Sequence, residues 1–104
     1  MIKVMITKNL EDNYTEYSQE GHAKEAVCSA ISAVSQAVIN SLLENVKVDL
    51  LLREEAGTTK IKVLEKDASN KEVQLLMKTL VEFTHGLQEV HPKHMMIISR
   101  IKGE

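Results

Sequence analysis

Hydrophobic and polar side chains alternate along several short stretches of this chain. Ile2, Val4 and Ile6 occupy every second position of the first stretch, which is the period of a strand with one buried face. Similar patterns predict four further strands, over residues 14–20, 46–52, 60–64 and 95–101. The polar, turn-forming residues 9–13 and 54–57 lie between neighbouring strands, so each is expected to close a hairpin.

Two longer segments repeat their apolar residues every three or four positions, which is the period of a helix with one buried side. Residues 26–44 carry few charges, so we expect them to form the central buried helix. The second helix is expected to begin at Ser69, which precedes Glu72 by three positions in the capping-box pattern, and to end before Pro92. The predicted buried positions are Val27, Ile31, Val34, Val38 and Leu42 in the first helix, and Val73, Leu76, Met77, Leu80, Thr84 and Leu87 in the second.

The predicted order of elements is strand, strand, helix, strand, strand, helix, strand. Hairpins on each side of a helix indicate a mostly antiparallel sheet with helices on its face, so we predict the α+β class and a two-layer α/β sandwich. A chain of 104 residues can bury one modest core, and residues 1–104 are expected to form a single domain. In the second strand, Tyr14 and Tyr17 are expected on opposite faces, which leaves one of them to meet water or a partner.

Charge and composition argue against several classes of function. A net charge of −2 provides no basic field, so we expect no direct nucleic-acid binding. The N-terminal residues lack the long apolar run of a secretory signal, and no stretch is expected to reach the length of a transmembrane helix. We therefore expect a cytoplasmic protein with no membrane partner. The single cysteine can form neither an internal disulfide nor a cysteine-rich zinc site.

Three histidines cluster near the end of the chain, but their spacing does not indicate a metal site. His85 and His91 are six positions apart, and His91 and His94 flank a proline, with no carboxylate at ligand spacing. These side chains are expected to be ordinary surface residues. The four glycines are too dispersed to build a phosphate-binding loop. We accordingly expect no metal and no cofactor.

The only cysteine, Cys28, is the strongest candidate for chemistry. It is expected near the start of a helix, where free backbone N–H groups and the helix dipole favour a thiolate. His22 lies six positions earlier, after Gly21, and a tight turn would bring its imidazole to the sulfur as the base of a nucleophile. The alternative is that Cys28 is a small buried packing residue, which is the more common role of a free cysteine.

The sequence Gly21-His22-Ala23, followed by Val27-Cys28-Ser29-Ala30-Ile31-Ser32, resembles the ribosomal-processing cysteine proteases of the Prp family. The similarity covers essentially the whole chain, including its length and order of elements. It implies an α/β sandwich that forms a homodimer and has Cys28 as nucleophile and His22 as general base. Gly21, Ala23 and Ser32 are implied as substrate-binding or supporting residues, although Ser32 is equally open to bonding its own helix backbone.

The resemblance also implies a substrate and a mechanism. The family removes a short N-terminal extension from a bacterial large-subunit ribosomal protein and cuts after an aromatic residue, so the expected partner is that precursor. Backbone N–H groups in the first turn of the helix, including that of Cys28, are expected to stabilise the oxyanion.

This sequence departs from the family pattern between the histidine and the cysteine. Most members have a longer loop there, with a glycine and an aspartate, whereas only Lys24-Glu25-Ala26 separates Ala23 from Val27. The family's loop is regarded as a mobile gate over the active site. The alternative is therefore a non-catalytic, ribosome-associated module of the same fold that has lost activity with its shortened loop.

Overall fold

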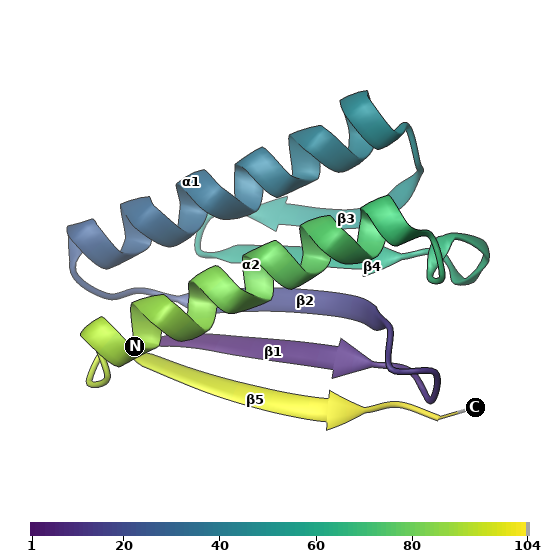
Figure 1. Ribbon diagram of the computed structural model, residues 1–104. Coiled ribbons are helices and arrows are strands. Elements are labelled where there is room, and N and C mark those ends of the chain that lie inside the picture. The colour runs from purple at the N-terminus through teal and green to yellow at the C-terminus, as the bar shows by residue number, and fades with distance from the viewer. Residues whose placement is uncertain (104) are drawn as a thin grey trace.

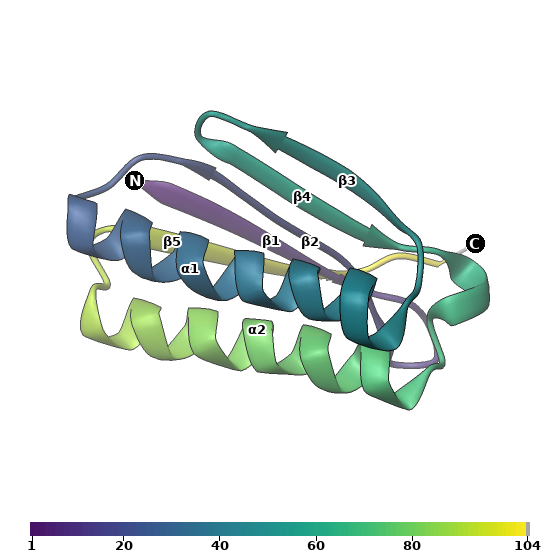
Figure 2. The same cartoon turned by 90° about the horizontal axis from the view of Figure 1, so that it is seen from above.

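The computed structural model describes residues 1–103, which form a five-stranded sheet covered on one face by two helices (Figures 1 and 2). The strands lie side by side in the order β3-β4-β2-β1-β5. Three neighbouring pairs are antiparallel, and only β1 and β5 run parallel. The predicted α+β class, the two layers and the order of elements are thus confirmed, with a mixed sheet. The strands are β1 (Ile2–Lys8), β2 (Tyr14–Gly21), β3 (Leu50–Glu55), β4 (Thr58–Val63) and β5 (Met95–Ile101).

The two helices lie on the same face of the sheet, and the core fills the space between the layers (Figure 2). Helix α1 spans Glu25–Ser41 and continues into a π-helical turn, η1 (Leu42–Val46). Helix α2 spans Lys71–Val90 and follows a short 3₁₀ helix, η2 (Glu65–Asp67). The core is mainly aliphatic, in keeping with an aromatic content of only 3%. Its fully buried side chains include Val4, Tyr17, Val27, Leu42, Ile61, Val73, Met77 and Leu80.

Tyr17 is the one aromatic side chain at the centre of this core, and it is completely buried. Its hydroxyl donates to Oε1 of Gln19 at 2.7 Å and lies 3.3 Å from Oγ1 of Thr84 on α2. Burial raises the pKa of Tyr17 well above its ordinary range, although the contact with Thr84 partly opposes this rise. The phenol therefore stays neutral in the folded protein at pH values where an exposed tyrosine ionises.

We expect this tyrosine to make the fold sensitive to alkali. Above about pH 10 the unfolded chain releases the Tyr17 proton while the folded chain retains it, so the free energy of unfolding falls as pH rises. Tyr17→Phe is expected to lower the free energy of unfolding by about 1–3 kcal/mol at pH 7, because Gln19 loses a buried donor. The same substitution should reduce the loss of stability above about pH 10, because phenylalanine has no proton to release. Denaturant unfolding at pH 7 and pH 10.5 measures both effects. An equal decline in the phenylalanine variant would contradict this assignment.

A β-bulge changes the expected placement of Tyr14. The register of β1 and β2 shifts after Thr7, so that Thr15 is an extra residue in β2. Tyr14 is consequently turned to the same face as Tyr17 and packs, half-buried, against the core. The prediction that the two tyrosines occupy opposite faces is wrong, because simple alternation does not survive an inserted residue.

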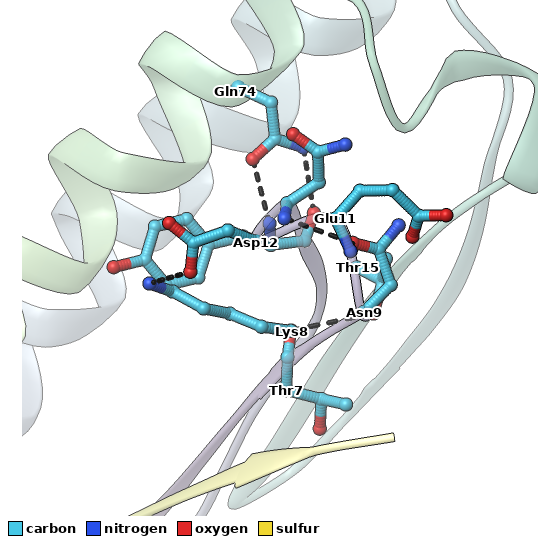
Figure 3. A network of polar contacts seen from close by, with 9 residues as sticks. Thr7, Lys8, Asn9, Glu11, Asp12, Thr15 and Gln74 are labelled. Carbon is cyan, nitrogen blue, oxygen red and sulfur yellow. Dashed lines mark hydrogen bonds and ion pairs between the residues drawn. The ribbon is translucent and has the colours of Figure 1, made fainter. Parts of the chain in front are cut away.

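The bulge lies beside the β1–β2 connection, which a side chain of α2 fixes in place (Figure 3). Gln74 accepts a hydrogen bond from the Tyr14 N–H at 2.7 Å. Its amide nitrogen donates to the carbonyl oxygens of Tyr14 and Ala68, each at 2.8 Å. In the turn itself, Asn9 accepts from the N–H groups of Glu11 and Asn13. The predicted turn at residues 9–13 is confirmed.

The third strand begins later than its pattern predicts. Val46 ends η1, and Lys47 adopts a left-handed conformation with φ of 66° that stops the helix. Strand β3 starts only at Leu50. Val46 and Val48 still pack against the core, so their alternation reports burial in a connecting segment rather than in a strand.

The start of α2 also differs from the prediction. Asn70, not Ser69, is the N-cap, and its Oδ1 accepts from the N–H groups of Glu72 and Val73 at 2.8 and 3.1 Å. Both residues are good caps, and Asn70 satisfies two free N–H groups with one oxygen. The capping box between Ser69 and Glu72 is therefore not formed.

Helix α1 covers the core but is not buried on all sides. Val27, Ile31 and Val38 are buried, whereas Ala33 and Gln36 on the outer side are exposed. The expectation of a central buried helix is wrong, because a helix in one layer of a two-layer fold keeps its outer side in solvent.

The expected absence of a segment of transmembrane length is also wrong. Residues Glu25–Val46 form 22 continuous helical residues that are apolar enough to span a membrane by length and composition alone.

Candidate functional site

A pocket of about 240 Å³ lies where β2 ends and α1 begins. Gly21, His22, Cys28 and Ser32 line one part of it. The β3–β4 hairpin lines the other part with Glu55, Gly57, Thr58 and Thr59, and Ile2, Gln19, Glu20 and Ile31 complete the wall. The fold thus brings four of the five predicted site residues to one cavity. The fifth, Ala23, contacts the cysteine directly.

Gly21 ends β2 in a conformation that suits glycine, with φ of 101°. A Cβ atom at this position would overlap the carbonyl oxygen of Met1. Its N–H donates to the carbonyl oxygen of Gly57 at 3.0 Å, which joins the end of β2 to the β3–β4 turn. Gly21 therefore allows the chain to leave the sheet directly into the segment that carries His22.

Cys28 occupies the first turn of α1, and its half-buried thiol is held by Ala23. The Ala23 N–H donates to Sγ, and the thiol donates to the Ala23 carbonyl oxygen, each at 3.3 Å. This pair of contacts fixes the sulfur against the backbone between β2 and α1. The alternative, that Cys28 is a buried packing residue, holds in part, because Cys28 is half-buried and also contacts the core. However, Cys28 also lines the pocket, which a purely structural cysteine does not need to do.

His22 lines the same pocket, and its side chain is exposed. Its backbone carbonyl accepts from the amino group of Met1, which ties the segment to the start of β1. Within residues 1–103, the imidazole makes no hydrogen bond to Cys28. The pair therefore shares a cavity in this structure without being joined by a hydrogen bond.

Ser32 lies one turn beyond Cys28 and lines the pocket with an exposed side chain. Its hydroxyl has no hydrogen-bond partner within residues 1–103, so the alternative in which it bonds its own helix backbone is not what this structure contains. The Ser32 carbonyl oxygen instead accepts from the Ser35 hydroxyl at 3.2 Å.

The backbone donors at the start of α1 differ from the expected set. The N–H of Cys28 donates to the Lys24 carbonyl oxygen at 3.2 Å, and that of Val27 donates to the same oxygen at 3.0 Å. Cys28 therefore has no free N–H for an oxyanion, which corrects the prediction. In the described part of the chain, Glu25 and Ala26 are the first-turn residues whose N–H groups lack a partner, as is usual at a helix start.

The three C-terminal histidines do not come together around a metal position. The rings of His91 and His94 meet edge to face with centroids 6.2 Å apart. Burial, together with the charge of Lys24 and the presence of His94, lowers the pKa of His91. No group of three or more His, Cys, Asp or Glu side chains within residues 1–103 is arranged to hold a metal ion.

The hairpin residues of the pocket were not identified from the sequence. The sequence pattern places Glu55 and Gly57 in a turn and assigns Thr58 and Thr59 to no element, and no motif links the four residues to Cys28. The pairing of β2 with β4, with Glu20 opposite Thr58, brings them to the site. Gly57 carried the one available signal, since a glycine in a tight hairpin often has a positive φ.

Comparison with known families assigns the chain to one of them. The model of the family described as cysteine protease Prp matches residues 1–96, and the protein therefore belongs to the Prp family. This family comprises cysteine proteases of ribosomal processing, so the predicted resemblance is confirmed. Comparison with curated protein sequences gives no significant match.

Solved structures have the same fold. The essential ribosomal processing protease Prp from S. aureus, in complex with a covalently linked product peptide, superposes with a TM-score of 0.88 at 25% identity, covering 95% of this chain and 99% of that one. The same protease with a substrate peptide gives 0.86 at 21% identity, with the same coverage. A protein from Streptococcus mutans gives 0.82 at 21% identity, covering 98% of this chain and 96% of its own.

Proposed function

We propose that this protein is a cysteine endopeptidase that removes the N-terminal extension of a bacterial large-subunit ribosomal protein. Cys28 would be the nucleophile and His22 the general base. The observation that carries the proposal is the pocket at the start of α1, which brings Cys28, His22 and Ser32 together although no regular element contains all three. Membership of the Prp family supports the same chemistry. The proposal includes a homodimer that acts in the cytoplasm.

In this mechanism the exposed imidazole of His22 accepts the proton of the Cys28 thiol. The thiolate attacks the scissile carbonyl carbon, and the carbonyl oxygen becomes an oxyanion. The unpartnered N–H groups of Glu25 and Ala26 are the available donors at the helix start, and losing one such donor typically costs about 3 kcal/mol. His22 then protonates the leaving amine, and water hydrolyses the thioester to release the acid and the free thiol.

A peptide assay tests the proposal. The purified protein is incubated with a peptide that spans the extension, and products are identified by mass spectrometry. We expect one cut, after an aromatic residue, and no cut when that residue is replaced by glycine. Pretreatment with iodoacetamide should abolish cleavage, because Cys28 is the only thiol in the chain. An intact peptide after prolonged incubation with the untreated protein would favour the non-catalytic module.

Ser32 is expected to support turnover without supporting the fold. Ser32→Ala should lower kcat/KM about 10-fold, because the pocket loses a hydroxyl close to Cys28. The free energy of unfolding, measured by thermal denaturation, should stay within about 0.5 kcal/mol of the wild-type value. Ser29→Ala is the matched control, since Ser29 is also an exposed serine of α1 but does not line the pocket. An equal loss of activity in the two variants would contradict a role for Ser32 in the site.

A further inference from the structure

Gly57 lies at the tip of the β3–β4 hairpin, 35 positions from His22 in the sequence, yet the His22 ring lies beside the position that a Gly57 side chain would occupy. An ideal Cβ atom built on Gly57 would lie 2.9 Å from Nε2 of His22 and 3.2 Å from Cε1. The first distance is shorter than real Cβ contacts, so any side chain at this position would displace the imidazole. The ring therefore occupies space that only a glycine leaves open.

The hairpin tip is fixed relative to the segment that carries His22. The Gly21 N–H donates to the Gly57 carbonyl oxygen at 3.0 Å, immediately before His22 in the chain. Thr58, the next residue of the hairpin, pairs with Glu20 across β2 and β4. The hairpin tip is thus tied to the end of β2 next to the imidazole, and Cys28 lines the pocket that Gly57 and His22 share.

We propose that Gly57 is a positioning residue for His22: its missing side chain lets the imidazole lie against the hairpin within the Cys28 pocket. This inference rests on the proposed role of His22 as the base. Because the His22 side chain is exposed, a clash with a new Cβ would be relieved by turning the ring and not by opening the fold. A substitution at Gly57 should therefore lower the rate of cleavage more than it lowers the stability of the fold.

Gly57 also has a second property, a φ of 79°, which must be separated from the first. Alanine at this position would add both a Cβ and backbone strain. Asparagine tolerates positive φ far better than alanine but carries the same Cβ. The two substitutions therefore share the contact with His22 and differ in the strain that they place on the turn.

The test compares Gly57→Ala and Gly57→Asn with Gly86→Ala, a helical control whose added Cβ meets nothing within 4 Å. We expect both Gly57 variants to lower kcat/KM for peptide cleavage 10- to 100-fold, the range expected for a misplaced catalytic group. The melting temperature should fall more for alanine than for asparagine. Recovery of wild-type activity with asparagine, together with recovery of stability, would show that only the turn conformation matters and would overturn the proposal.

A second measurement does not depend on peptide cleavage. The imidazole NMR signals of His22, identified by their loss in His22→Ala, should shift in both Gly57 variants and stay in place in Gly86→Ala. The signals of His85, which does not line the pocket, serve as the internal reference. Unshifted His22 signals in the Gly57 variants would overturn the positioning role even if the protein cleaves the peptide. Shifted signals without any cleavage by the wild type would instead retain the contact and reject the protease function.

Discussion

Cys28→Ala is expected to abolish cleavage of the precursor peptide, with a loss of at least about 1,000-fold in kcat, while the protein remains folded. The reason is that the covalent route requires the sulfur, and no second thiol exists in the chain. The stability cost should be about 1 kcal/mol, since the half-buried thiol gives up its weak contacts with Ala23 and part of its packing against the core. Peptide cleavage and thermal unfolding of the same preparation measure the two effects.

His22→Ala completes this prediction, because a base and its nucleophile act as a unit. The single variant should lose about 100-fold or more in kcat, which is the usual contribution of a positioned base. The Cys28→Ala/His22→Ala double variant should be no worse than Cys28→Ala alone. Ser29→Ala, an exposed neighbour outside the pocket, should cleave like the wild type. Undiminished cleavage by either site variant would show that the pocket is not the active site.

The sequence pattern predicts most of this fold because most of its elements repeat a simple period. Ile2, Val4 and Ile6 are buried as their alternation predicts, and Val27 and Ile31 are buried as helical spacing predicts. The errors occur where one local feature breaks the period. The extra residue Thr15 turns Tyr14 to the core face, and the left-handed Lys47 leaves Val46 at the end of a helix.

The site was predictable only for residues that lie close together in the sequence. Gly21, His22 and Cys28 lie within one short segment, and the β2–α1 connection comprises only residues 22–24, so sequence proximity becomes spatial proximity. Gly57 reaches the same pocket through strand pairing, which no local pattern reports. The hydrogen bonds of the Cys28 thiol depend on the exact turn at Ala23, and the polar residues around it do not specify that turn in advance.

Gly21→Ala is expected to damage both the fold and the site more than any other glycine substitution in this chain. Alanine at φ of 101° is strained, and its Cβ would overlap the Met1 carbonyl oxygen, a backbone atom that cannot turn aside as a side chain can. Strain of this kind costs about 1–3 kcal/mol, and the overlap adds to it, so we expect the melting temperature to fall by about 10 °C or more.

The activity of Gly21→Ala should fall further than its stability explains, because the residue that must move directly precedes His22. At a temperature where the variant is still folded by circular dichroism, kcat/KM should be at least about 100-fold below that of the wild type, the penalty for a catalytic group misplaced by about 1 Å. Gly86→Ala is the matched control: it lies on an exposed turn of α2, meets nothing, and should gain about 0.5–1 kcal/mol at unchanged activity. A Gly21→Ala protein with wild-type turnover would show that the β2–α1 segment does not set the position of the base.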